Sequence, residues 1–151
     1  MIGDLETGLA NYLTARITSG ALLTAGTWVV VPATAVTEFS AEKANIVVRV
    51  ADLPRTAGSI ETGGLYDASV EITVQVAADL TGAVTLQRTA ERAVLAAWVG
   101  ATLSGLKTTV EAQLATGQTF GGYYARGWRP GREETNFLPV FEVTVGVDTT
   151  V

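Results

Sequence analysis

Residues 66–78 alternate between apolar and polar side chains, and this alternation constrains the fold more than any other feature of the sequence. The apolar positions are Tyr66, Ala68, Val70, Ile72, Val74, Val76 and Ala78. The intervening positions are Asp67, Ser69, Glu71, Thr73, Gln75 and Ala77. A period of two is that of a β-strand, in which successive side chains point to opposite faces. At ~3.3 Å per residue the run predicts a strand of about 40 Å, which is longer than usual and should project beyond its own domain.

The rest of the chain predicts a single α+β domain over residues 1–151. An apolar stripe at helical spacing predicts a helix over residues 2–17; it consists of Ile2, Leu5, Leu9, Leu13 and Ile17. A second helix should follow Thr85, a candidate N-cap. β-Branched or alternating runs predict further strands over residues 27–31, 45–51, 107–115 and 140–147. The expected order is α-β-β-β-α-β-β, with a mostly antiparallel sheet, two helices on one of its faces, and loops over residues 33–44, 55–64 and 116–139.

Composition argues against catalysis. The chain has neither His nor Cys, so it lacks the commonest general base, the commonest zinc ligand and any thiolate nucleophile. The glycines of residues 58–64 have neither the spacing nor the Lys of a phosphate-binding loop. Glu133 and Glu134 are adjacent and flanked by Arg132, which disfavours a shared-proton pair. We therefore expect no enzyme, no cofactor and no metal.

Acidic residues that could bind a hard cation are Asp52, Glu61 and Asp67, but their spacing does not resemble that of a calcium loop. The longest apolar stretches, residues 28–31 and 94–99, are too short to span a membrane. The net charge of −5 disfavours general binding to nucleic acid or to an anionic membrane.

Residues 121–132 depart from this acidic average, because three Arg residues alternate with aromatic residues there. The candidate interface residues are Tyr66, Tyr123, Tyr124, Arg126, Trp128, Arg129 and Arg132. Tyr, Trp and Arg are enriched at protein–protein interfaces, which is the interpretation we favour. A long hairpin whose aromatic residues cover its own sheet, or a weak nucleic-acid contact, would use the same residue types. Arg49, Asp52 and Arg55 could likewise pair across an interface or lie at a solvated strand end.

The order of elements resembles that of the tail-terminator, or tail-completion, proteins of long-tailed bacteriophages. An N-terminal amphipathic helix leads to NIVVRVADLPR at residues 45–55 and to YDASVEITVQVAAD at residues 66–79. After the second helix come a loop rich in Gly, aromatic residues and Arg, and the final strand LPVFEVTVGV at residues 138–147. The similarity extends over nearly the whole chain and lies in pattern, length and order.

The resemblance implies a structural virion protein. Copies of such proteins form a homohexameric ring that caps the tail tube, ends its polymerisation and offers a surface for head joining. The implied partners are further copies of the chain, the tail tube protein and the head–tail connector protein, with at most non-specific DNA contact in the lumen. The implied location is the head-proximal end of the tail, after assembly in the host cytoplasm. A head-completion, connector or minor capsid protein, and an unrelated small cytoplasmic binding module, are the alternatives.

Overall fold

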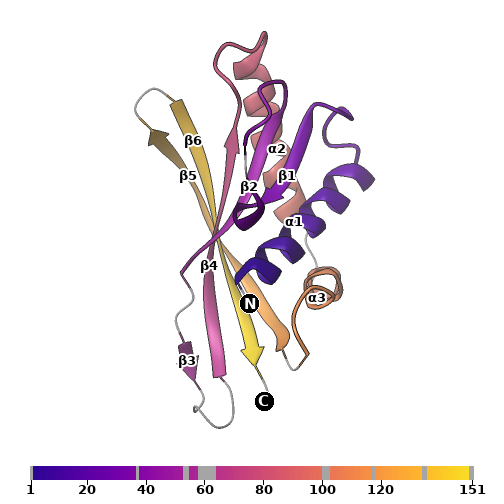
Figure 1. The fold of residues 1–151 in the computed structure, drawn as a ribbon, viewed down its shortest axis with the longest axis vertical. Coiled ribbons are helices and arrows are strands. Elements are labelled where there is room, and N and C mark those ends of the chain that lie inside the picture. Colours follow the sequence, from indigo (N-terminus) through magenta and orange to yellow (C-terminus); the bar gives the residue numbers. More distant parts are fainter. Residues whose placement is uncertain are drawn as a thin grey trace.

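The computed structural model describes residues 2–36, 38–52, 55–57, 64–99, 103–116, 118–133 and 136–149. Within these residues a mixed sheet is covered on one face by helices (Figure 1). The helices are α1 (Ile2–Ser19), α2 (Ala83–Val99) and α3 (Leu103–Glu111), with a 3₁₀ turn, η1, at Ala33–Ala35. The strands are β1 (Trp28–Pro32), β2 (Ala44–Asp52), β3 (Arg55–Ala57), β4 (Gly64–Gln75), β5 (Gln118–Glu133) and β6 (Asn136–Thr149).

The strands form one sheet in the order β1-β2-β4-β6-β5, and β3 pairs with β4 beside this path. The β1–β2 pair is parallel, and every other pair is antiparallel. This confirms the predicted α+β class with a mostly antiparallel sheet and helices on one face. β4 ends at Gln75 rather than Ala78, and Figure 1 shows its lower end, together with β3, extending past the helices.

The core lies between the helices and one face of the sheet. The predicted alternation of β4 is confirmed, because Ala68, Val70, Ile72 and Val74 are fully buried whereas the polar residues between them are half-buried. The α1 stripe is buried from Leu5 to Ile17 as well, and only Ile2 at its start is 43% exposed. We call the opposite side of the sheet, which carries Val47, Glu71 and Thr73 in register, the helix-free face.

Residues 107–115 were predicted as a strand, and this prediction is wrong for the described part of the chain. Residues 103–111 form α3 instead. The reason is that Leu106, Val110 and Leu114 recur every four residues, so one side of a helix is apolar. Leu106 and Val110 are fully buried, and Leu114 packs against the core. Thr108, which lies on the same side of the alternating pattern as Val110, is exposed, and its hydroxyl donates to the Ser104 carbonyl oxygen at 3.0 Å.

Three further predictions need correction. Residues 55–64 were predicted as a loop, but Arg55–Ala57 form β3, because the start of β4 supplies a backbone partner for them. Residues 116–139 were predicted as a loop, but most of them form β5 and the start of β6, which pair with each other in a long hairpin. Helix α2 begins at Ala83, so Thr85 lies inside it and is not the N-cap. The Gly82 carbonyl accepts the first bond of the helix, from Leu86 N at 3.0 Å, and Gly82 has a φ of 74°.

Candidate assembly interface

The candidate interface residues lie on two strands. Tyr66 belongs to β4 and the other six belong to β5. The structure describes the backbone of these positions, so their place is given by strand register, because residues opposite each other on neighbouring strands share a face of the sheet. Tyr66 is opposite Val147, which in turn is opposite Phe120 on β5.

Register separates the β5 candidates into rows of opposite faces. Trp128 shares a row with Phe141 and with the fully buried Ile72 of β4. Tyr123 shares a row with Val145 and the fully buried Ala68. These two positions therefore belong to rows of the core face, and their side chains lie outside the described residues.

Tyr124 and Arg129 occupy the other set of rows. Tyr124 is in line with Ser69 of β4, and Arg129 is in line with Thr73, both of which are half-buried residues of the helix-free face. Arg126 falls at an irregularity between Ala125 and Gly127 and has no register partner. The strand therefore does not gather the Arg and aromatic residues into one cluster, and Tyr124 and Arg129 are the candidates best placed for a partner.

The tip of the hairpin extends beyond the neighbouring strand. Pairing between β4 and β6 ends at Thr73 and Val140, whereas pairing between β5 and β6 continues to Glu133 and Asn136. Arg132, opposite Phe137, lies in this last section. Among the described strands, β5 and β6 alone pair in this section, so the end of the hairpin is a two-stranded arm.

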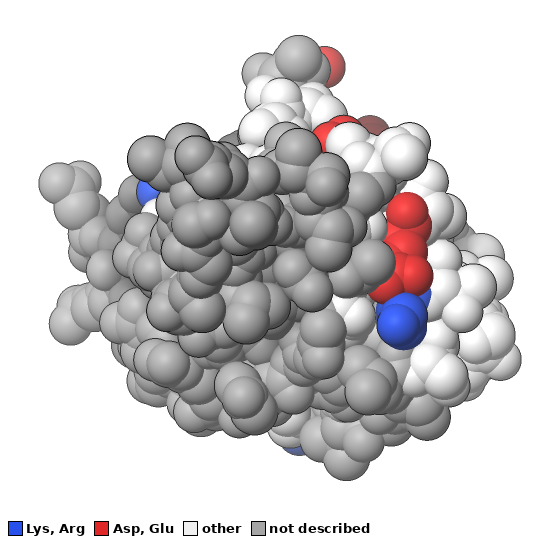
Figure 2. Space-filling view, turned by 90° about the horizontal axis from the view of Figure 1, so that it is seen from below, with Lys and Arg blue, Asp and Glu red and all other residues white. Residues whose placement is uncertain are grey.

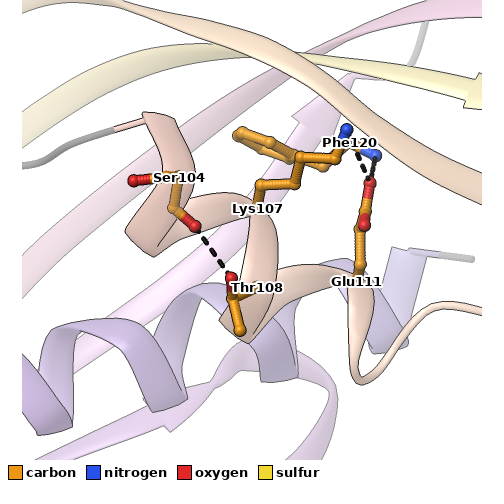
Figure 3. A network of polar contacts seen from close by, with 5 residues as sticks. All are labelled: Ser104, Lys107, Thr108, Glu111 and Phe120. Atoms are coloured by element: carbon orange, nitrogen blue, oxygen red, sulfur yellow. Dashed lines mark hydrogen bonds and ion pairs between the residues drawn. The ribbon is translucent and has the colours of Figure 1, made fainter.

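The base of the hairpin is fixed to α3 by Glu111 (Figure 3). The backbone N–H of Phe120 donates to Glu111 Oε1 at 2.9 Å, and Lys107 Nζ lies 3.8 Å from the same oxygen. Phe120 itself is 1% exposed and belongs to the core. Ala115 and Gln118 close the turn between α3 and β5, since Gln118 N donates to the Ala115 carbonyl at 3.0 Å. The first residues of β5 therefore have a fixed position relative to the helices.

Helix α3 is in turn held against α1 at Gly8. A Cβ atom built on Gly8 would lie 2.9 Å from the Cα and 3.2 Å from the carbonyl oxygen of Val110. Real Cβ atoms essentially never approach another atom so closely, so the two helix backbones meet at a distance that only glycine permits.

Glu6 connects α1 to the sheet, and sequence reasoning missed this role. The carboxylate is 2% exposed, and its two oxygens accept from the backbone N–H groups of Thr34, at 3.1 Å, and Val50, at 2.8 Å. β1 ends at Pro32, opposite Val48, and therefore offers no carbonyl to Val50. The Glu6 carboxylate accepts from the Val50 N–H of β2 in its place. The sequence feature that could have indicated this role is the position of Glu6, which follows Leu5 and lies close to the apolar stripe of the helix.

Two described charged side chains of the helix-free face lie beside each other on β2 and β4. Arg49 Nη1 lies 3.9 Å from Glu71 Oε2 on the neighbouring strand, and the Arg49 side chain is 64% exposed. An ion pair this exposed contributes about 0–1 kcal/mol to stability. The side chains of Asp52 and Arg55, which were expected to join Arg49, lie outside the described residues.

Helix α2 carries a half-buried carboxyl group, that of Glu91, beside two Arg residues. Burial raises the pKa of the Glu91 carboxyl above its ordinary value, and the neighbouring charges of Arg88 and Arg92 and a hydrogen bond with Gln87 only partly oppose this effect. Seen from below, the described surface is mostly uncharged, with acidic and basic side chains adjacent at one place (Figure 2).

The described part of the chain contains no group of three acidic residues placed to hold a metal ion. The candidates that the sequence disfavours lie outside the described residues. They are residues 58–63 of the glycine-rich stretch and the side chains of Asp52, Glu61, Asp67, Glu133 and Glu134. None of the described helices is both long enough and apolar enough to cross a membrane.

No family model matches this chain, and no curated protein matches it.

Proposed function

We propose that this protein is a structural component of a bacteriophage tail, in which copies of the chain form a ring that caps the tail tube. The ring ends tube polymerisation and provides the surface to which the head connector binds. Such a role requires contacts with three kinds of neighbour, namely further copies of the chain, the tube protein and the connector. It requires no catalytic group and no cofactor.

The observation that carries the proposal is the long hairpin of β5 and β6. Its strands are 16 and 14 residues long, and its end passes beyond the last residue of β4 that pairs with β6. Its base is held to the helix layer through Glu111 and Phe120. An arm that is fixed at one end and unsupported by other strands at the other suits contact with a neighbouring molecule in an assembly.

The test uses the tail tube protein of the same phage, polymerised in the presence and absence of this chain. We expect the chain to stop elongation and to be visible as a cap at one tube end by negative-stain electron microscopy. The informative variant removes the arm by joining Arg129 to Val140 through an Asn-Gly turn, which leaves every β4–β6 pair intact. This variant should fold but fail to cap.

The alternatives give different results in the same experiment. A chain that leaves tube length unchanged but binds isolated heads is a head-completion or connector protein. If the chain binds neither tubes nor heads, the proposed function is wrong.

A further inference from the structure

Strand β1 is an edge of the sheet with backbone groups available for a further strand. Among the described strands it pairs with β2 alone, on one side. The Thr27 carbonyl accepts from Ala44 N at 2.9 Å, so the backbone groups of Thr27 point toward β2. Because the backbone groups of successive residues in a strand point to opposite sides, the N–H and C=O groups of Trp28 and Val30 point away from β2. An unpaired row of this kind is a template for pairing with another chain.

The surroundings of β1 lack the protection that edge strands usually carry. Residues 17–37 contain no charged residue, and from 18 to 36 each of them is exposed or half-buried. Edge strands are normally protected by charges, bulges or proline. β1 has only Pro32, at its last position, and its pairing with β2 has no irregularity. Charged residues are depleted from the centres of protein interfaces, and this accessible, uncharged edge has that character.

The opposite edge of the same sheet is β5, and its first half is also uncharged. Residues 112–125 contain no charged residue, and they include the start of β5. The N–H groups of Gln118 and Phe120 are bonded within the chain, to the Ala115 carbonyl and to Glu111 Oε1, so the uncharged section left for another strand is Gly121–Ala125. The pairings between the strands make β5 run antiparallel to β1. If two copies are placed end to end in the same orientation, β5 of one copy therefore meets β1 of the next as an antiparallel pair.

We propose that β1 of one copy pairs with the Gly121–Ala125 section of β5 in the next copy. The sheet then continues from subunit to subunit, and each copy uses two different edges. A head-to-tail contact of this type leaves an unpaired edge at each end of an open chain, and a closed ring removes both. The proposal rests on the proposed function for the closure of the ring, but edge pairing itself is testable without any tail component.

The first test places a charge on the edge. Val31 is half-buried and outside the core cluster, so Val31→Lys should leave the fold intact. We expect the wild-type chain to self-associate in analytical ultracentrifugation, and Val31→Lys to raise the dissociation constant about tenfold or more. The control is Val84→Lys on α2, where the residue is 68% exposed and the same change should not alter association. Equal association of the Val31→Lys and wild-type chains, or a wild-type chain that is monomeric up to about 1 mM, would overturn the proposal.

The second test uses the absence of cysteine from the chain. Val31→Cys combined with Tyr124→Cys places one thiol position on each edge, in rows of the helix-free face. Oxidation should give a ladder of cross-linked species in denaturing gels, whereas Val84→Cys with Tyr124→Cys should not. The absence of a ladder at concentrations where the chain associates contradicts edge pairing. A ladder from a chain that does not cap tubes supports edge pairing and refutes the proposed function instead.

Discussion

Replacement of Gly8 by Ala tests the close packing of α1 on α3. In most helices this change is favourable, because glycine is destabilising relative to alanine by about 0.5–1 kcal/mol. Here the added methyl group would lie 2.9 Å from Val110 Cα and 3.3 Å from Val110 Cγ1, so backbone as well as side chain must move. Such overpacking costs about 1–3 kcal/mol. We expect a net loss of about 1–2 kcal/mol in the free energy of unfolding.

The same helix offers a matched control. A Cβ atom on Gly3 would lie 3.5 Å from Thr34 Oγ1, which is an ordinary van der Waals contact. Gly3→Ala should therefore be neutral, or more stable by up to about 1 kcal/mol. For a domain of this size, 1 kcal/mol corresponds to about 2–4 °C in Tm. We therefore expect Gly8→Ala to have a lower Tm than the wild-type chain, and Gly3→Ala to have an equal or higher Tm.

Urea and thermal denaturation measure both variants. If Gly8→Ala is as stable as Gly3→Ala, the helices do not meet at Gly8 as the structure describes. Amide hydrogen exchange adds a second readout, because α3 holds the first residues of β5 through Glu111. Displacement of α3 should speed exchange at Phe120 more than exchange in β2.

Three other predictions concern single side chains. Glu6→Ala should cost about 3 kcal/mol in urea denaturation, because it leaves the buried Val50 N–H without its charged acceptor, and Glu6→Gln should cost less because the amide oxygen can still accept one bond. Glu91→Gln should gain stability relative to the wild-type chain as the pH rises from about 3 to 7. Below the ordinary carboxyl pKa Glu91 is protonated in both states, and above it the raised pKa means that ionisation disfavours the folded state. Arg129→Ala should weaken tube capping about fivefold to tenfold without lowering Tm, whereas Arg88→Ala on α2 should not weaken it.

Each of these has a clear contrary result. A Glu6→Ala chain as stable as the wild type would mean that the carboxylate does not complete the edge of β2. A stability difference for Glu91→Gln that is constant with pH would contradict the raised pKa. If the Arg129→Ala and Arg88→Ala variants cap tubes equally well, β5 does not contact the tube through Arg129.

The elements that could be predicted from the sequence are those with one uninterrupted periodicity. In β4 the apolar residues occur at every second position from Ala68 to Val74, and in α1 they recur from Leu5 to Ile17 at helical spacing. Both patterns arise because one face of the element is buried against the core. Each of these two segments fits only one periodicity, so its sequence predicts only one type of element.

The errors have physical causes. Residues 107–115 satisfy period two and period four together, because Val110 and Leu114 belong to both patterns; burial of Leu106 decides for the helix. β5 contains glycines and Pro130, which locally favour a turn, and it is a strand because β6 supplies its partners. Strand pairing over this hairpin is not encoded in the residue types of β5 alone. The role of Glu6 depends on where β1 ends, and this position is set by contacts distant in sequence.

Helix α1 connects the two edges that are proposed to pair between copies. Its Glu6 binds Val50 of β2, beside the end of β1, and its Gly8 packs against α3, whose Glu111 binds the start of β5. The two edges belong to one sheet, and α1 connects them a second time through residues only two apart in its sequence. A ring closes only if the angle between successive subunits is fixed, and these contacts add to the strand pairing in fixing the relative position of the edges. Gly8→Ala should accordingly impair ring closure more than pairing: its cross-linked products should include open oligomers of mixed size, whereas Val31→Lys should give few oligomers at all.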